Sequence, residues 1–292
     1  MAEPVPSSRS LPPAFAERAR EFATGKLTPV PARPASTVVL LRDAIAGLEV
    51  YVLRRLPSMA FAGGMQAFPG GAVDPRDTDD DTALGWLGPS AAEWASRLGT
   101  GEPAARGFVC AAVREMFEES GVLLASAPGR LPVVPAGAAW EEARQDLVER
   151  RLALSELFER RGLAVRSDLL RPWAHWITPR FEPRRYDTWF FLAALPDGQH
   201  ARDVSGEADR AAWARPRDAI AAAESGDVVM LPPTWSVLDQ LAWYETVADA
   251  LTAADNRRIE TVTPGWVDEN GEIRLVLPGD PAFPGDDPGE PA

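Results

Sequence analysis

This chain has very little cysteine and no long hydrophobic runs. Cys110 is its only cysteine in 292 residues, which excludes an internal disulfide and any CxxC pair for zinc or an iron–sulfur cluster. No stretch of about 18 apolar residues occurs, as a membrane span requires, and the first residues lack the apolar core of a signal peptide. We therefore expect a cytoplasmic protein that does not enter a membrane.

Positive charge is also scarce. Lysine and arginine together number 30 against 43 aspartates and glutamates, which gives a net charge of −13. A field of this sign repels nucleic-acid phosphates, so we expect no nucleic-acid partner. An acidic protein can still accept an anionic small molecule where divalent cations and local arginines invert the potential.

The remaining composition suits one large domain. Hydrophobic residues make up 46% of the chain, enough for a sizeable core. Residues 1–34 are rich in Pro, Ser, Ala and Arg, and we expect a flexible arm with a short helical patch at 15–22. Residues 279–292 mix Pro, Gly and Asp and are expected to form a disordered acidic tail, which leaves 35–278 as the main domain.

Hydrophobic periodicity predicts both strands and helices along the main domain. Runs rich in Val and Leu predict a strand pair at 36–41 and 48–55, and a further strand at 66–73 reaches paired glycines. Further strands are predicted at 173–178, 188–195 and 208–214, helices at 104–120, 139–161, 216–224 and 234–252, and a late hairpin at 267–277. A mixture without strict alternation is typical of an α+β fold.

The predicted helix at 104–120 carries a cluster of acids. Glu115, Glu118 and Glu119 stand at i, i+3 and i+4, so their carboxylates share one face, away from the apolar stripe. Like charges at this spacing destabilise a helix by about 0.2 to 0.5 kcal/mol per pair. A hard divalent cation accepting carboxylate oxygens removes that conflict, so this face is a candidate metal site. The plainer alternative is a solvated acidic face.

The residues around the cluster resemble a known motif. The run from Arg114 to Val122 reads R-E-M-F-E-E-S-G-V and matches every fixed position of the second half of the Nudix box, R-E-U-x-E-E-x-G-U, where U is apolar. The first half, a glycine, five intervening residues and then an acid, is matched by Gly71 and Asp77, with Asp in place of Glu. Thirty-six residues separate Asp77 from Arg114 where the family has seven, so the box is split and 78–103 reads as an insertion.

A box split in this way resembles one branch of the Nudix hydrolases, the coenzyme A and acyl-coenzyme A diphosphatases of the mammalian peroxisomal type. Segments similar to that branch extend over about residues 36–250, and they include Leu53-Arg54-Arg55, Gly64, Phe68-Pro69-Gly70-Gly71, 176–180, 184–188 and 231–234. The coenzyme A signature is imperfect, because Leu56 and Ala60 stand where it has a small residue and a second arginine. The resemblance implies a Nudix α/β/α sandwich with a mixed sheet and extra helices from insertions.

The resemblance also implies roles for individual residues. Mg²⁺, or Mn²⁺ in its place, would be held by Glu115 and Glu119 with Glu118 as a further ligand, so that Glu118 and Glu119 serve catalysis. Arg114 would orient a glutamate or close the loop, and Glu207 resembles the late acid that many Nudix enzymes use as a base or an additional metal ligand. The expected substrate contacts are Gly70, Gly71, Arg54, Arg55, Arg180, Arg184 and Arg185, since arginine can donate two hydrogen bonds to phosphate.

The activity implied is hydrolysis of the diphosphate bond of coenzyme A or acyl-coenzyme A, releasing adenosine 3′,5′-bisphosphate and an (acyl)phosphopantetheine. Two alternatives stay open. One is the same chemistry on ADP-ribose or a dinucleotide polyphosphate, and the other is a Nudix-fold binding module without turnover. The sequence also leaves open a homodimer, and whether the insertion is a lid, a dimer contact or an acyl-binding element.

Overall fold

The computed structural model describes residues 13–58, 63–78, 84–204, 206, 208–269 and 272–283. The chain divides into two compact units. The larger comprises Ala35–Ala174 and Trp189–Ile259, and the smaller comprises Met1–Pro34, His175–Thr188 and Glu260–Ala292. The domain boundaries predicted from the sequence stay predictions.

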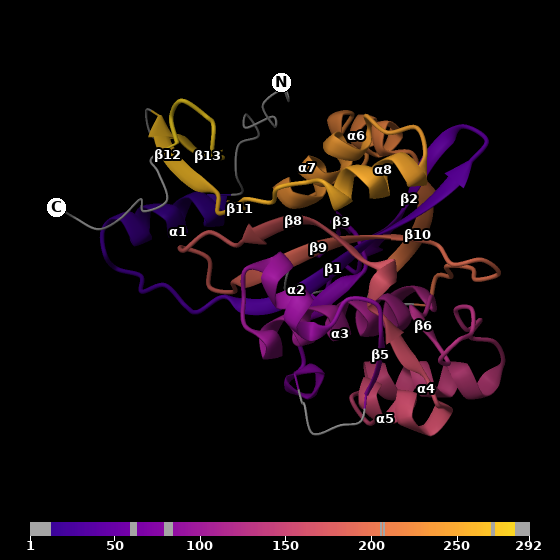
Figure 1. Cartoon of the computed structure of the whole chain (residues 1–292). Coiled ribbons are helices and arrows are strands. Elements are labelled where there is room, and N and C mark those ends of the chain that lie inside the picture. Colours follow the sequence, from indigo (N-terminus) through magenta and orange to yellow (C-terminus); the bar gives the residue numbers. More distant parts are fainter. Residues whose placement is uncertain are drawn as a thin grey trace. The chain divides into compact units, whose positions relative to one another are not determined.

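A mixed sheet forms the centre of the larger unit (Figure 1). Its strand order is β10-β2-β1-β9-β8, and the short strands β3 and β4 pair with β2 and β1. β1 and β2 form the expected antiparallel pair, with Leu41 opposite Val50. The bounds are β1 (Arg33–Ala44), β2 (Gly47–Arg55), β3 (Gln66–Ala67), β4 (Gly70–Ala72), β8 (Arg171–Ile177), β9 (Tyr186–Ala194) and β10 (Ala208–Ala214). The strands predicted at 36–41, 48–55, 173–178, 188–195 and 208–214 are confirmed. The strand predicted at 66–73 instead forms two short strands with different partners, β3 and β4, separated at Pro69, which has no N–H to donate.

Helices cover both faces of this sheet (Figure 1). On one face lies α3 (Glu102–Ser120), whose stripe of Val109, Val113 and Met116 is fully buried in the main core. It ends at Gly121 in the left-handed conformation, φ 72°, as the sequence predicted. On the other face lie α6 (Pro216–Glu224), α7 (Pro232–Leu241) and α8 (Val247–Asp255). The α+β class and the three-layer Nudix arrangement are therefore confirmed.

The described part of the insertion belongs to the packed body of the larger unit. Its strand β5 (Gly85–Leu87) pairs in parallel with β7 (Ala164–Arg166), which also pairs with β6 (Ala125–Ser126). Its helix α2 (Ala91–Leu98) buries Trp94 completely, with the indole 5.8 Å from the ring of Phe191 in an edge-on arrangement. Residues 84–103 therefore pack against the core of the larger unit, and the further role of the insertion stays a prediction.

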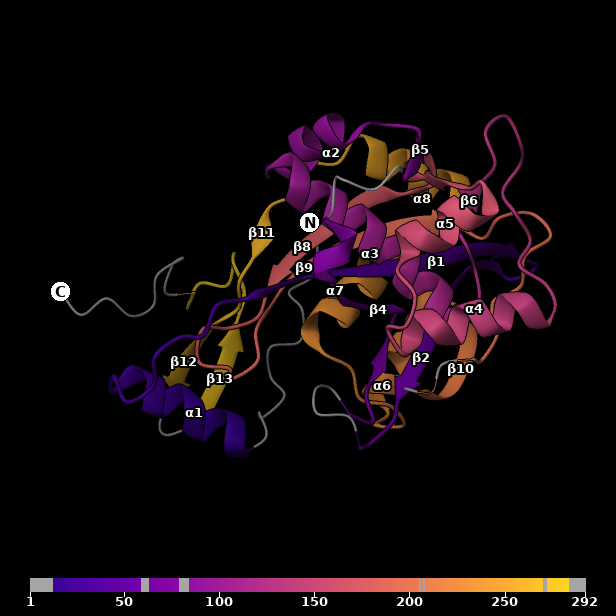
Figure 2. The same ribbon diagram turned by 90° about the horizontal axis from the view of Figure 1, so that it is seen from below.

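Two predictions of single long helices were wrong. Residues 139–161 form α4 (Ala138–Val148) and α5 (Leu154–Arg161), because Arg150 takes a left-handed φ of 57° and reverses the chain. Residues 234–252 divide into α7 and α8 at Thr246, whose hydroxyl accepts a hydrogen bond from the backbone N–H of Asp249 and so begins a new helix. The first break places α4 alongside α3 (Figures 1 and 2).

The smaller unit is built on a helix and a hairpin. Helix α1 (Pro13–Ala23) buries Ala19 against Phe181 and Ile273, and Arg18 forms an ion pair with Glu182 at 2.7 Å. Residues 13–23 of the expected flexible arm are therefore helical. The predicted hairpin is confirmed as β12 (Gly265–Glu269) and β13 (Glu272–Val276), with its turn at residues 270–271 outside the described residues. A short strand, β11 (Thr261–Val262), pairs in parallel with the end of β8.

Within the described residues, no helix is both long and apolar enough to span a bilayer.

Replacing Trp94 with Ala tests whether the insertion supports the core. Removing a fully buried tryptophan should lower the free energy of unfolding by about 3 to 5 kcal/mol, measured by urea denaturation. Trp243→Ala is the matched control, since Trp243 is 73% exposed and its loss should change stability by less than about 0.5 kcal/mol. Equal effects of the two substitutions would show that the insertion contributes nothing to the core.

Candidate active site

The paired glycines predicted to form a turn lie directly against the carboxylate face of α3. The Gly70 N–H donates to Glu119 Oε2 at 2.9 Å. A Cβ on Gly71 would lie 2.4 Å from Glu115 Oε1, and one on Gly70 would lie 2.5 Å from the carbonyl oxygen of Ser36. Glycine is thus required at Gly70, where a side chain would meet the backbone of β1, while at Gly71 an added methyl group would displace the Glu115 carboxylate.

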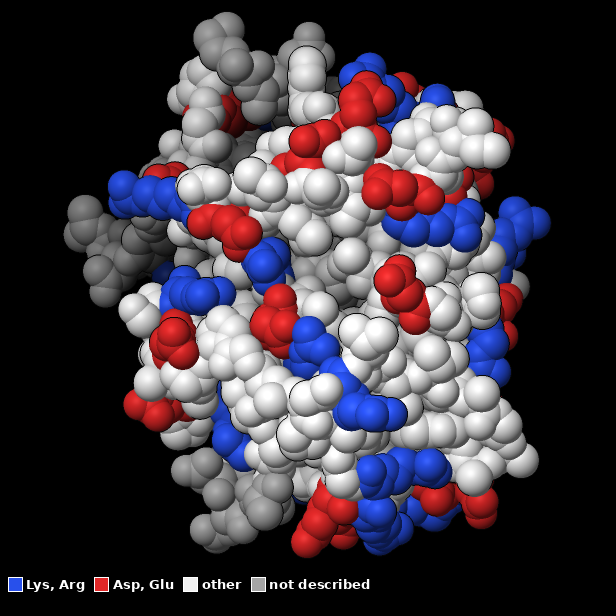
Figure 3. Space-filling model, turned by 45° about the vertical axis from the view of Figure 1, so that its right-hand side comes forward, with Lys and Arg blue, Asp and Glu red and all other residues white. Residues whose placement is uncertain are grey.

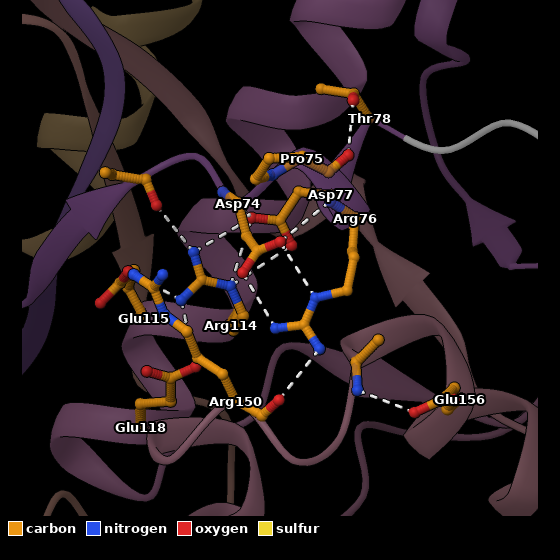
Figure 4. Close-up of polar contacts among 12 residues, drawn as sticks. Asp74, Pro75, Arg76, Asp77, Thr78, Arg114, Glu115, Glu118, Arg150 and Glu156 are labelled. Carbon is orange, nitrogen blue, oxygen red and sulfur yellow. Dashed lines mark hydrogen bonds and ion pairs between the residues drawn. The ribbon is translucent and has the colours of Figure 1, made fainter.

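A buried guanidinium connects this loop to the helix (Figure 4). Arg114 donates from Nη1 to Glu115 Oε1 at 2.7 Å and to Glu118 Oε1 at 3.1 Å. Its Nη2 donates to Asp77 Oδ2 at 3.0 Å and to the carbonyl oxygen of Ala72 at 2.9 Å. Arg114 therefore orients two of the three helix carboxylates while it closes the loop, and its part in catalysis stays a prediction.

Asp77, the shorter acid of the split motif, is held in place by its own turn. It ends the 3₁₀ turn η1 (Pro75–Asp77), where its carboxylate accepts from the Asp74 N–H at 2.9 Å. Asp74 in turn binds Arg76 through two hydrogen bonds of 3.0 and 2.9 Å, which hold the pKa of Asp74 at about 2. Burial raises the pKa of Asp77, and the charge of Arg114 opposes that rise. The shorter side chain of aspartate is thus long enough to bind Arg114, although the insertion separates the two residues in the sequence.

Glu115 lies in an environment that disfavours its charge. Its pKa is raised to about 7, mainly by burial and also by the charge of Glu118, while the nearby Arg114 opposes the rise. On the face shown in Figure 3, acidic and basic side chains are intermixed, so the excess of acid is not gathered into one area there.

The chemistry of these side chains suits a divalent cation. Carboxylate oxygens are the ligands that Mg²⁺ prefers, and a cation would relieve the burial of Glu115. Within the described residues, no three His, Cys, Asp or Glu side chains are already arranged around one metal position. Glu115 and Glu118 face Arg114, and Glu119 faces Gly70, so metal binding requires one or more of them to rotate. The predicted metal role of the three glutamates stays a prediction.

Two side chains that were not predicted from the sequence bind backbone carbonyl oxygens near the C-terminal end of α3. Arg144 of α4 is 1% exposed and donates from Nη1 to the carbonyl oxygen of Glu118 at 2.6 Å. The Tyr51 hydroxyl donates to the carbonyl oxygen of Arg202 at 2.8 Å. Burial raises the pKa of Tyr51, and the charges of Asp203 and Glu119 add to that rise. The sequence carried no signal for these contacts, because each partner comes from a distant segment.

The arginines predicted to bind substrate are distributed over different parts of the molecule. Successive strand residues face opposite sides, so Arg55 shares the face of Tyr51 and Leu53, which α3 covers, while Arg54 lies on the other face. The other three predicted arginines belong to the smaller unit. Arg185 donates to the carbonyl oxygens of Thr178 and Val30, and Arg180 and Arg184 are exposed. Their substrate roles stay predictions, and Glu207 lies outside the described residues.

The remaining single-residue predictions concern whether a side chain is buried. Trp173, Trp176 and Trp189 are buried, as predicted, and so is Cys110, where burial raises the pKa of the thiol. His175, which had no predicted role, lies within hydrogen-bonding distance of Asp187 and Thr261, at 2.5 and 2.8 Å.

Comparison with known proteins agrees with this geometry. The family model for the NUDT19 Nudix domain matches residues 89–241, more than half of the chain. A crystal structure of a NUDIX hydrolase from Alicyclobacillus acidocaldarius shares 32% sequence identity and a TM-score of 0.63, covering 76% of this chain and 96% of that one. The fold and the motif define a Nudix hydrolase. Within that superfamily, the chain belongs to the NUDT19 Nudix family.

Curated proteins with similar sequences lie in the same family. The chain is 27% identical over 282 residues to the acyl-coenzyme A diphosphatase NUDT19 of Gallus gallus, covering 82% of this chain and 73% of that protein. It is 27% identical over 283 residues to the human protein of the same name, covering 81% and 72%.

Gly71→Ala tests the close approach of loop and helix. The added methyl should displace the Glu115 carboxylate and lower the free energy of unfolding by about 1 to 3 kcal/mol in urea denaturation. Gly101→Ala is the matched control, because a Cβ there meets nothing closer than 3.9 Å. A Gly71→Ala protein as stable as the control would contradict the described contact.

Proposed function

We propose that this protein hydrolyses the diphosphate bond of coenzyme A or acyl-coenzyme A in a reaction that depends on Mg²⁺, with Mn²⁺ able to replace it. The products are adenosine 3′,5′-bisphosphate and an (acyl)phosphopantetheine. The observation that supports this chemistry most directly is the contact of the Gly70–Gly71 turn with Glu115 and Glu119. The substrate class is supported by the acyl-coenzyme A diphosphatases among its relatives.

The residues that would hold the cation are Glu115, Glu118 and Glu119. When bound, the cation neutralises diphosphate charge and acidifies the attacking water. The oxygen of water then bonds to one phosphorus while one of its protons is released to solvent, the bridging P–O bond breaks, and the other phosphate leaves with the bridging oxygen. The protein contributes mainly position and charge to such a reaction.

Arg114 contributes by fixing where the carboxylates lie. Because its guanidinium is anchored to Asp77 and to the Ala72 carbonyl, rotation of Glu115 or Glu118 toward a cation starts from one defined geometry. Glu119 is separately oriented by the Gly70 N–H. The three glutamates thus begin in different environments, which allows different roles in binding and catalysis.

Neutralising a single glutamate tests the metal assignment. Glu118→Gln and Glu119→Gln keep the shape of the side chain and remove its charge, so each should lower kcat about 100-fold or more and weaken Mg²⁺ binding in calorimetry. Glu224→Gln, an exposed position on α6, should leave both unchanged. Turnover at the unmodified rate in both test variants would reject these residues as metal ligands.

A substrate panel tests the substrate class and the cofactor together. With Mg²⁺, coenzyme A and its acyl esters should be cleaved with higher kcat/KM than ADP-ribose or diadenosine tetraphosphate, and EDTA should abolish all turnover. A strong preference for ADP-ribose would reject the coenzyme A assignment. Binding of Mg²⁺ and nucleotide without any turnover would instead identify a non-catalytic module.

A further inference from the structure

The loop between β9 and β10 is fastened to the segment that follows α3. Gln199 is buried, and its side-chain amide accepts from the N–H of Leu123 at 2.8 Å and donates to the carbonyl oxygens of Leu123 and Val133 at 2.9 and 2.8 Å. Three residues later, the Arg202 N–H donates to the Ser120 carbonyl oxygen at 2.9 Å. The Tyr51 hydroxyl binds the carbonyl oxygen of the same residue. The backbone of Arg202 is therefore held from both sides.

This anchoring places the Arg202 guanidinium against Gly121, the residue at which α3 ends. A Cβ on Gly121 would lie 2.8 Å from Nη2, so the absence of a side chain makes room for the guanidinium. The side chain of Arg202 is 48% exposed. Its backbone is fixed while its charged end is accessible to solvent, beside the turn of α3 that carries Glu118 and Glu119.

The ion pair that Arg202 makes is easily exchanged. Its Nη2 lies 3.5 Å from Glu141 Oε2. Glu141 also accepts three hydrogen bonds from the buried Arg144, at 2.5 to 3.2 Å. Release of Arg202 therefore leaves Glu141 paired, and a half-exposed pair of this kind contributes only about 0 to 1 kcal/mol.

Three other arginines near the helix have fixed partners. Arg114 and Arg144 are buried, with Arg114 bound to Asp77 and Arg144 to the carbonyl oxygen of Glu118, and Arg76 is bound to Asp74 through two hydrogen bonds. Arg202 combines a fixed backbone, an exposed guanidinium and an exchangeable partner, and arginine suits phosphate because its planar group donates two hydrogen bonds at once.

We propose that Arg202 is a substrate-binding residue whose guanidinium leaves Glu141 and donates to a phosphate group of the nucleotide. This inference rests on the proposed function. It assigns a phosphate contact to the loop after β9, in addition to the arginines that the sequence suggested. The phosphate is either in the diphosphate or on the 3′ position of the ribose, and the substrates below separate the two.

The test compares Arg202→Gln and Arg202→Lys with the unmodified protein on coenzyme A and 3′-dephospho-coenzyme A. Losing a charged hydrogen bond to phosphate should raise KM for coenzyme A about 10- to 100-fold in Arg202→Gln with little change in kcat. Arg202→Lys, which keeps the charge without the planar group, should show a smaller rise. Arg215→Gln is the matched control, since Arg215 pairs with Asp218 on the surface.

The two substrates locate the phosphate. A KM rise for coenzyme A alone assigns Arg202 to the 3′-phosphate, and an equal rise for both assigns it to the diphosphate. An unchanged KM for both substrates overturns the proposal, as does a fall in melting temperature without a change in KM, which is the mark of a purely structural residue. If Arg202→Gln does not fold, Arg202→Lys carries the same comparison.

Failure of the proposed function is distinguishable from failure of this inference. If the unmodified protein does not cleave coenzyme A, the proposed function fails, and Arg202 is tested by calorimetry with pyrophosphate and adenosine 3′,5′-bisphosphate. Affinity at least about 10-fold lower in Arg202→Gln for either ligand supports a phosphate contact. Equal affinities, or no binding by the unmodified protein, overturn it.

Discussion

The buried guanidinium of Arg114 is the interaction on which the site depends. It binds Asp77 and the Ala72 carbonyl on the loop side, and Glu115 and Glu118 on the helix side. A charge removed from water is tolerated only when its partners are in place, and these carboxylates need Arg114 for the same reason. The requirement is mutual, so loop and helix assemble as one unit although thirty-six residues separate Asp77 from Arg114.

Around that centre, α3 is fixed by contacts of different kinds. Ser36 of β1 donates to the Phe108 carbonyl oxygen at 2.6 Å, and Arg144 binds the carbonyl oxygen of Glu118 near the other end. Gly70 donates to the Glu119 carboxylate, and Gly71 lies against the carboxylate of Glu115. Because Ser36 and Arg144 bind backbone carbonyl oxygens of α3, these two anchors persist when a carboxylate rotates.

Local signals explain what could be predicted from the sequence. The apolar stripe and the left-handed Gly121 marked α3, and the acidic spacing marked the face that meets the Gly70–Gly71 turn. The break at Arg150 was missed because Glu149-Arg150-Arg151 contains no glycine or proline, although Arg150 adopts a positive φ. Gln199 and Leu123 are 76 residues apart, so their contact depends on the tertiary fold. The same holds for the smaller unit, which joins three separate stretches of chain.

The interruption of the Nudix box has a small thermodynamic cost. Lengthening a connection from seven to thirty-six residues raises its closure free energy by only about 1.4 kcal/mol, since the entropy grows with the logarithm of length. Burial of Trp94 offsets more than that. The insertion also supplies β5, the parallel neighbour of β7. A chain shortened to the ordinary spacing would expose that strand edge, and exposed edges are where polypeptides recruit one another into aggregates.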